Sequence, residues 1–264
     1  METRKPDYKN WMPKGMIQAF AAAAAAFLAV GIVTRCLMDD GTLKTVIIVI
    51  AYAAAVILAG VTVWCAVLYH AFDYNGPRQM SKQIIDGLSD YVVLPEGGVG
   101  LDVGCGSGAL TIACAKKNPR ARMVGIDRWG AEYASYSQLL CAQNAVAEGV
   151  RNVSFQQGDA NKLIFPDESF DAVTSNYVYH NIGVKDRQVL LRETLRCLKK
   201  GGTFAIHDIF SKARYGDMEK FVRELKDSGY ESAELIDTTN GMFMSRNEAR
   251  WMELAGSAIL YGKK

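Results

Sequence analysis

"LDVGCGSGALTIA" (Leu101–Ala113) is the stretch that decides the fold class of this chain. Its first residues are typical of a buried strand and its last residues of a helix, and Gly104, Gly106 and Gly108 lie between them. Glycine permits a tight turn and lets a ligand approach the backbone closely. A helix that begins directly after such a turn presents free N–H groups. We therefore expect a strand, a ligand-binding turn and a helix in succession.

The chain around this stretch alternates between short apolar runs and helical patterns. The apolar runs cover residues 99–103, 122–126, 152–156, 171–175 and 203–207, and the helical patterns cover 107–117, 130–147 and 185–199. Two further strands are expected near 232–237 and 256–261. Strands that alternate with helices predict a parallel sheet covered on both faces. Such a sheet binds its ligands beyond the carboxyl ends of its strands.

The glycine spacing by itself leaves two kinds of cofactor open. A dinucleotide-binding turn has the pattern G-x-G-x-x-G, whereas this chain has Ala109 at the last glycine position. Asp127 ends the next strand, about twenty residues further on, where a carboxylate can accept hydrogen bonds from both ribose hydroxyls. That carboxylate suits NAD equally well, so these residues do not separate the two.

The third and fourth strands distinguish between the two kinds of cofactor. "VSFQQGDANKLIFPDESFDAVTSN" (153–176), followed by "LRETLRCLKKGGTFAIHD" (191–208), resembles the class I S-adenosylmethionine-dependent methyltransferases, especially those of ubiquinone and menaquinone biosynthesis. The resemblance covers residues 77–264 and four motifs in the right order. It implies an α/β fold with a doubly wound, seven-stranded Rossmann-like sheet whose last strand is antiparallel. It also implies S-adenosylmethionine as the cofactor and methyl transfer as the activity.

The resemblance assigns one group of residues to the methionine part of the cofactor. The carboxylate of Asp102 and the backbone of Gly104, Gly106 and Gly108 would hold this part. Asn176, after the fourth strand, would line the pocket beside it.

A second group is assigned to the adenosine. Asp127 would bind the ribose hydroxyls, and Arg128 and Trp129 would flank the adenine. Asp159 would accept a hydrogen bond from the adenine amino group, with the Ala160 N–H beside it.

Candidate catalytic residues follow the fourth and fifth strands. Methyl transfer is an in-line displacement that depends mainly on alignment, but an acceptor that holds a proton needs a base. His180 is the best candidate base by residue type, with Tyr179 and Asp208 beside it as further catalytic candidates. A structural role for His180 stays open, as do substrate contact and loop capping for Asp208. No residue selects oxygen, nitrogen, carbon or sulfur as the acceptor atom.

Two apolar segments precede this domain. Residues 45–69 contain no charged residue and are long enough to cross a hydrocarbon core of about 30 Å. Residues 15–37 form a second candidate span, uncharged as far as Thr34, with Arg35 placed to reach the headgroups. We expect an antiparallel transmembrane hairpin. The alternatives are a buried core helix for the second segment and a signal peptide for the first.

The distribution of basic residues predicts the orientation of this hairpin. Basic residues flank its two outer ends, whereas the linker between the spans has equal numbers of acidic and basic residues. The flanking residues are Arg4, Lys5, Lys9 and Lys14 before the first span, and Arg78 and Lys82 after the second. This excess predicts a protein of the cell membrane with both termini and the catalytic domain in the cytoplasm.

The predicted organisation has four parts. Residues 1–14 form a cytoplasmic N-terminus, 15–70 the two transmembrane helices, 71–98 a connecting segment with an entry helix, and 99–264 the cofactor-binding domain. The glycine turn and the acidic residues assigned to the cofactor all lie after the hairpin. We therefore expect a chain without residues 1–74 still to bind the cofactor.

Composition limits the partners. A net charge of +2 gives no support for nucleic-acid binding. Six cysteines without C-x-x-C or metal-ligand spacing predict reduced thiols and no metal site. The expected partners are the lipid bilayer and a small, lipophilic or membrane-associated acceptor, either a lipid, a quinone or a thiol. The alternatives are a non-catalytic, membrane-tethered ligand-binding protein of the same fold and an NAD-binding oxidoreductase. The oligomeric state stays open.

Overall fold

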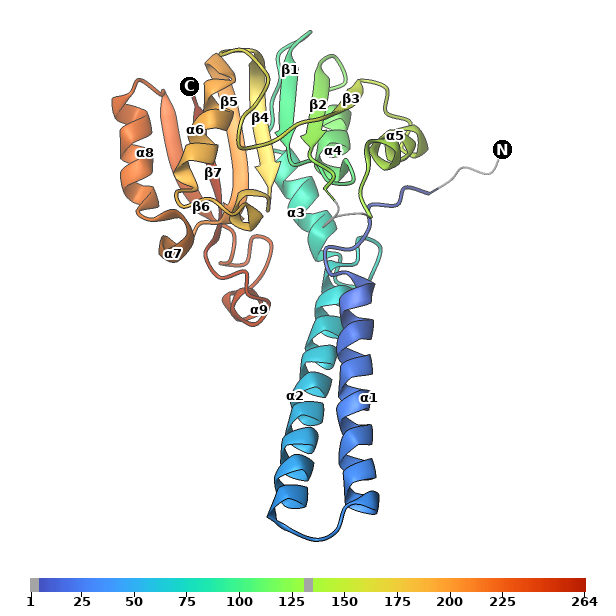
Figure 1. Ribbon diagram of the computed structural model, residues 1–264. Helices are drawn as coiled ribbons and strands as arrows, with labels where there is room; N and C mark the ends of the chain where they lie inside the picture. Colours follow the sequence, from blue (N-terminus) through green and yellow to red (C-terminus); the bar gives the residue numbers. More distant parts are fainter. Residues whose placement is uncertain (1–4, 131–134) are drawn as a thin grey trace. The chain divides into compact units, whose positions relative to one another are not determined.

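The computed structural model describes residues 5–130 and 135–264, so Arg4 of the orientation argument lies outside the described residues (Figure 1). The chain divides into two compact units. One unit is Asn10–Ser81, which holds two long helices. The other contains Lys82–Lys264 together with the described part of Met1–Lys9. No pattern in the sequence indicated that residues before the hairpin belong to the second unit.

The second unit is built on a seven-stranded sheet of order β3-β2-β1-β4-β5-β7-β6. Its strands, in chain order, are β1 (Val99–Val103), β2 (Arg122–Asp127), β3 (Val153–Gln157), β4 (Phe170–Asn176), β5 (Leu198–Ile209), β6 (Ser232–Asp237) and β7 (Ser257–Lys263). Strands β1 to β5 pair in parallel, and β7 is antiparallel to both of its neighbours, β5 and β6. The predicted fold, including the antiparallel last strand, is confirmed.

Helices cover both faces of this sheet (Figure 1). The helices that follow the two long ones are α3 (Met80–Ser89), α4 (Ala109–Lys117), α5 (Gln138–Ala147), α6 (Gln188–Arg196), α7 (Lys212–Tyr215), α8 (Met218–Asp227) and α9 (Arg246–Trp251), with a short 3-10 turn, η2 (Tyr179–Asn181). Successive side chains of a strand point to opposite faces. Accordingly Leu101 of β1 packs in the core cluster that includes residues of α6 and α8, while the next residue, Asp102, bonds to Thr111 of α4.

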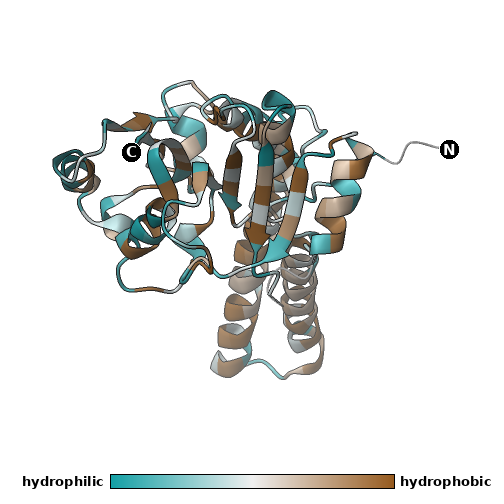
Figure 2. Cartoon of the chain, turned by 90° about the horizontal axis from the view of Figure 1, so that it is seen from above, coloured by the Kyte–Doolittle hydropathy of each residue, from teal (hydrophilic) through white to brown (hydrophobic). Residues whose placement is uncertain are grey.

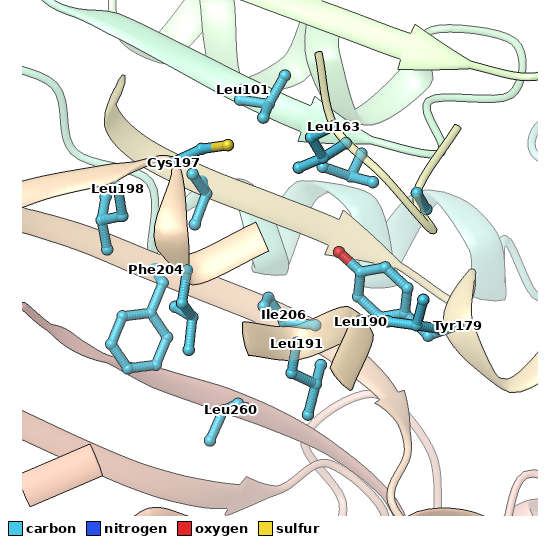
Figure 3. Packing of buried hydrophobic residues seen from close by; sticks show 14 of the residues in the cluster. Leu101, Leu163, Tyr179, Leu190, Leu191, Cys197, Leu198, Phe204, Ile206 and Leu260 are labelled. Carbon is cyan, nitrogen blue, oxygen red and sulfur yellow. The ribbon is translucent and has the colours of Figure 1, made fainter. Parts of the chain in front are cut away.

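The core on the α6 and α8 face is continuous and fully buried. Figure 3 shows Leu190 and Leu191 of α6 beside Phe204 and Ile206 of β5, and none of these four side chains exceeds 1% exposure. Burying side chains of this size contributes about 1.5–3 kcal/mol each. This core therefore fixes the strands whose ends carry the site.

All five parallel strands end at the same edge of the sheet. Asp127 and Asn176 are the last residues of β2 and β4, and Asp102 and Asp208 are next to last in β1 and β5. The side chains that the sequence singled out thus converge at the carboxyl edge.

The first unit contains α1 (Lys14–Leu37) and α2 (Thr42–Phe72), which run close to the predicted bounds. Both helices are long and apolar enough to cross a membrane. They pack on each other through small residues: a Cβ on Gly31 would lie 2.4 Å from the ring of Tyr52, and Ala51 and Ala55 are buried. Close packing through small residues is typical of membrane helices.

Candidate active site

The glycine turn after β1 has three glycines with positive φ, and they serve different purposes. Gly104, Gly106 and Gly108 have φ values of 75°, 55° and 83°. A Cβ on Gly104 would lie 2.4 Å from Val178, and one on Gly108 would lie 3.0 Å from Phe155. At Gly106 the same Cβ would meet no atom within 4 Å. The first and third glycines are thus required by packing, whereas Gly106 borders open space where a ligand can approach the backbone.

Asp127 is tied to this turn. Its Oδ2 accepts a 2.9 Å hydrogen bond from Gly106 N, and its Oδ1 accepts a 2.8 Å bond from Trp129 N. Each carboxylate oxygen can accept a second hydrogen bond. The half-buried carboxylate can therefore hold the turn and bind a vicinal diol at the same time.

Asp102 is 1% exposed and accepts a 2.6 Å hydrogen bond from the Thr111 hydroxyl. Burial raises the pKa of Asp102 to about 7; the Thr111 bond opposes this effect, and the nearby charge of Asp127 adds to it. A buried carboxylate that is half ionised near neutral pH is stabilised by a cationic ligand. The amino group of the methionine part is such a cation.

The residues assigned to the adenine have different environments. The indole N–H of Trp129 donates to Gly106 O at 3.0 Å, which ties this ring to the glycine turn, while Arg128 is exposed. Asp159 is exposed and accepts two bonds from Asn161, and Ala160 is buried beside it. Their roles toward adenine stay predictions.

Asn176 lies next to a polar pair that the sequence did not single out as a site. Asn176 Oδ1 lies 2.9 Å from His207 Nδ1, and His207 Nε2 lies 3.0 Å from the hydroxyl of Thr238. Burial lowers the pKa of His207 to about 3, so this imidazole is neutral. His207 therefore orients Asn176 and carries no charge of its own.

His180 and Asp208 form a hydrogen-bonded pair at the other end of the site. His180 Nδ1 lies 2.6 Å from Asp208 Oδ1, and Asp208 also accepts bonds from the backbone N–H groups of Tyr179, His180 and Ile209. Burial would raise the pKa of Asp208, but the hydrogen bond and charge of His180, with the Ile209 bond, lower it below its usual value. An ionised Asp208 accepts a hydrogen bond from His180 Nδ1–H, which leaves Nε2 without a proton and able to accept one.

The three catalytic candidates differ in burial, and the short turn η2 sets the directions of two of them, Tyr179 and His180. It directs Tyr179 into the core, where the side chain is fully buried and its hydroxyl lies 2.6 Å from Thr194 (Figure 3). His180, one residue later, keeps 15% of its side chain exposed. Asp208 is fully buried behind it. Of these three side chains only His180 is partly exposed, and Tyr179 lies in the core, where a direct catalytic role is not expected.

Tyr177 is a neighbour that the chosen candidates omit. It has a φ of 54°, its hydroxyl lies 2.7 Å from Ser257 Oγ, and its ring centroid lies 4.5 Å from that of His207. Positive φ in a bulky residue is strained and is concentrated at functional sites. The aromatic residues that follow β4 were the signal in the sequence that could have indicated Tyr177. Its strained backbone is visible only in the structure.

The pKa of Asp102 predicts how cofactor binding depends on pH. If the ionised carboxylate binds the cationic methionine part, the Kd for S-adenosylmethionine should fall by about tenfold between about pH 6 and about pH 8, as the binding-competent fraction rises. Calorimetric titration of the detergent-solubilised protein measures this change. Asp102→Asn should bind more weakly and lose the pH dependence. A wild-type Kd that stays constant over this range would contradict the assignment.

Substitutions of Asp127 test the ribose contact. Asp127→Ala should weaken S-adenosylmethionine binding by about 1.5–3 kcal/mol, because it removes a charged hydrogen-bond acceptor. Asp127→Asn keeps one carbonyl oxygen and should give an intermediate loss. Asp227→Ala, at an exposed acid of α8, is the matched control and should bind normally. Unchanged affinity in Asp127→Ala would remove Asp127 from the site.

Comparison with known proteins agrees with this geometry. Residues 101–206 match a family described as a methyltransferase domain. The chain is 35% identical over 112 residues to the uncharacterized methyltransferase YcgJ of Bacillus subtilis, covering 42% of this chain and 40% of that protein. It is 34% identical over 133 residues to the 2-phytyl-1,4-naphtoquinone methyltransferase of Thermosynechococcus vestitus, covering 50% of this chain and 55% of that protein. The chain thus spans about half the length of these relatives.

A solved structure supports the fold alone. The [4+2]-cyclase SpnF superimposes with a TM-score of 0.52 at 20% identity, over 73% of this chain and 85% of that protein.

The residues present fit the cofactor that these matches imply. Gly106 leaves space at the turn, Asp102 offers a buried carboxylate, and Asp127 has acceptor sites to spare. The NAD alternative is set aside, and S-adenosylmethionine is the cofactor of this domain. Residues 101–206 thus match the methyltransferase domain family, and the strand order and the glycine turn of the chain agree with that match.

Proposed function

We propose that the protein is a membrane-anchored methyltransferase that transfers the methyl group of S-adenosylmethionine to a small, lipophilic acceptor that loses a proton in the reaction. The observation that carries this proposal is the pair formed by His180 and Asp208. It lies at the same edge of the sheet as the glycine turn and Asp127. The pair supplies a base in addition to the alignment that methyl transfer needs.

The bound cofactor supplies a methyl group on a sulfonium, which is a good leaving group and needs no acid. The protein's own part is to align the acceptor and remove its proton. Asp208, kept ionised by His180 and the surrounding N–H groups, holds the His180 ring in the tautomer whose Nε2 accepts a proton. The carboxylate then stabilises the imidazolium that forms, as in other His–Asp pairs.

The surroundings of the pair favour an apolar, planar acceptor. Tyr177 lies edge-on to His180, with ring centroids 5.9 Å apart, and Phe243 lies 5.5 Å from the ring of His207. Aromatic rings favour stacked or edge-on contacts with other rings. One relative acts on a naphthoquinone by name. We therefore place a quinol or phenol first among the acceptors, ahead of a lipid or a thiol.

The exposed surface of the two long helices supports the membrane anchor. Large apolar side chains are exposed along both helices: Leu37 is 80% exposed, Val56 72% and Ile57 66%. Figure 2 shows both helices largely in the brown of hydrophobic residues. Apolar surface of this extent is rare on soluble proteins and marks contact with a partner or a membrane. The length of both helices selects the membrane.

One end of the hairpin has the composition of a membrane interface. Trp11 packs against Phe72, and the Lys14 ammonium lies 5.3 Å from the ring of Tyr69. Aromatic and basic side chains are enriched where a helix leaves the bilayer. The basic residues that flank the hairpin lie before its first span and after its second. We therefore assign this end to the cytoplasmic side, together with both termini and the methyltransferase domain.

Loss of the base should reduce turnover without affecting the cofactor. His180→Ala should lower kcat by about a hundredfold or more, the range of a lost general base. Its Kd for S-adenosylmethionine should stay within about twofold of the wild-type value, since His180 serves the acceptor. Transfer of labelled methyl groups to a reduced naphthoquinone in detergent micelles measures the rate, with a simple phenol and an alkyl thiol as competing acceptors.

Two further variants complete this experiment. Asp208→Asn should lower turnover through His180, and His70→Ala, at an exposed histidine outside the domain, should have no effect. Full turnover in His180→Ala would mean that the enzyme works by alignment alone. Binding of S-adenosylmethionine without transfer to any acceptor, in a wild-type protein of proven fold, would favour the non-catalytic alternative.

The orientation is tested by labelling. In sealed right-side-out vesicles, a single cysteine in place of Asp39 should react with a membrane-impermeant maleimide, because the linker faces outward. A cysteine in place of Lys264 should react only after the vesicles are opened. Both proteins are made in a background without the native cysteines. The reverse pattern would invert the topology.

A further inference from the structure

The segment Lys5–Lys9 precedes the long helices but belongs to the methyltransferase unit. Tyr8 is 6% exposed, which is unusual for a residue so near a chain end. The chain turns at this point: Lys9 has a φ of 57°, and its N–H donates to Asp7 Oδ1. The segment is thus a shaped element of the domain, not a loose tail.

Asn144 of α5 binds this segment by its backbone. Its Oδ1 accepts from Asp7 N at 2.8 Å, and its Nδ2 donates to Asp7 O at 2.9 Å. The same Nδ2 donates to Ser107 O at 3.0 Å. The Asn144 amide is 2% exposed, so these bonds are shielded from water. One side chain therefore joins the N-terminal segment to the glycine turn.

Two further hydrogen bonds hold Tyr8 in this segment. The Ser107 hydroxyl donates to Tyr8 O at 2.9 Å, and the Tyr8 hydroxyl donates to Glu148 Oε1 at 2.9 Å. Glu148, at the end of α5, is also paired with Lys116 of α4. Asp7 and Tyr8 are thus held by the turn, by α5 and, through Glu148, by α4. We call Asp7, Tyr8 and Asn144 the N-terminal clasp.

The position of Ser107 connects the clasp to the cofactor. Ser107 lies between Gly106, which borders open space, and Gly108, which caps α4. A glycine-rich turn has many accessible conformations and needs outside contacts to hold one of them. The clasp fixes both the carbonyl and the hydroxyl of Ser107, and thereby the backbone that faces the cofactor.

We propose that the N-terminal clasp is part of the cofactor site, with Asn144 as the positioning residue that holds the glycine turn in its binding conformation. The inference rests on the glycine turn being the cofactor site. It also makes the two long helices an insertion within the domain, since residues on both sides of them complete it. The expectation that a chain without residues 1–74 binds the cofactor normally is not supported by this arrangement.

The test uses the full chain in detergent. Asn144→Ala should raise the Kd for S-adenosylmethionine at least tenfold by calorimetry, and Ser107→Ala should raise it severalfold. In hydrogen exchange without ligand, both variants should show faster exchange at residues 104–108. Removing residues 2–9 should have the largest effect, and a synthetic peptide of residues 1–13 should restore binding in part. A purely structural role would lower the unfolding temperature without this selective exchange or this rescue.

Two controls separate the possible failures. Gln143→Ala removes an amide from the neighbouring position of α5 and should leave both the Kd and the exchange unchanged. Gly106→Val should abolish binding; if it does not, the glycine turn is not the cofactor site. If Gly106→Val abolishes binding while Asn144→Ala and Ser107→Ala keep the wild-type Kd, the clasp is only a packing contact and the inference is wrong. The two point variants decide the matter even if the deletion fails to fold.

Discussion

The parallel pairing of β1 with β2 on one side and β4 on the other is the constraint on which the site depends. Asp102 lies opposite Gly125 of β2 and Thr174 of β4 in this register. The connections after β1 and β4 therefore leave the same edge as neighbours, which is the switch point where α/β sheets bind ligands. The contact is close enough that Gly104 has no room for a side chain beside Val178. The glycine turn after β1 and the segment after β4 meet at this contact.

Burial acts on three ionisable groups of this edge with different results. Burial raises the pKa of Asp102 to about 7, although Thr111 donates hydrogen bonds to it, and the nearby charge of Asp127 adds to the rise. Asp208 is equally buried, but backbone N–H groups and His180 surround it and lower its pKa. His207 has only neutral partners and loses its proton. Local hydrogen bonds, more than depth, decide which groups carry charge.

The N-terminal segment changes how the chain is divided. A methyltransferase domain that follows a membrane anchor would be an independent module. Here residues before α1 form hydrogen bonds with α5 and with the glycine turn. The domain therefore contains residues from both sides of the hairpin. Folding of the domain then depends on a contact of large sequence separation, which is costly in loop entropy and forms late.

The sequence by itself determined the succession of strands and helices, the glycine turn, the acid after β2 and the two long apolar helices. Each of these depends on local periodicity or on the length of one segment, which tertiary packing does not override. It could not place Tyr179 in the core and His180 at the surface, because a single 3-10 turn decides which of two adjacent side chains points inward. It could not show Asp208 behind His180, or Asn144 bound to Asp7 across 137 residues. Hydrogen bonds between distant segments have no periodic signature, so only the packed tertiary structure decides them.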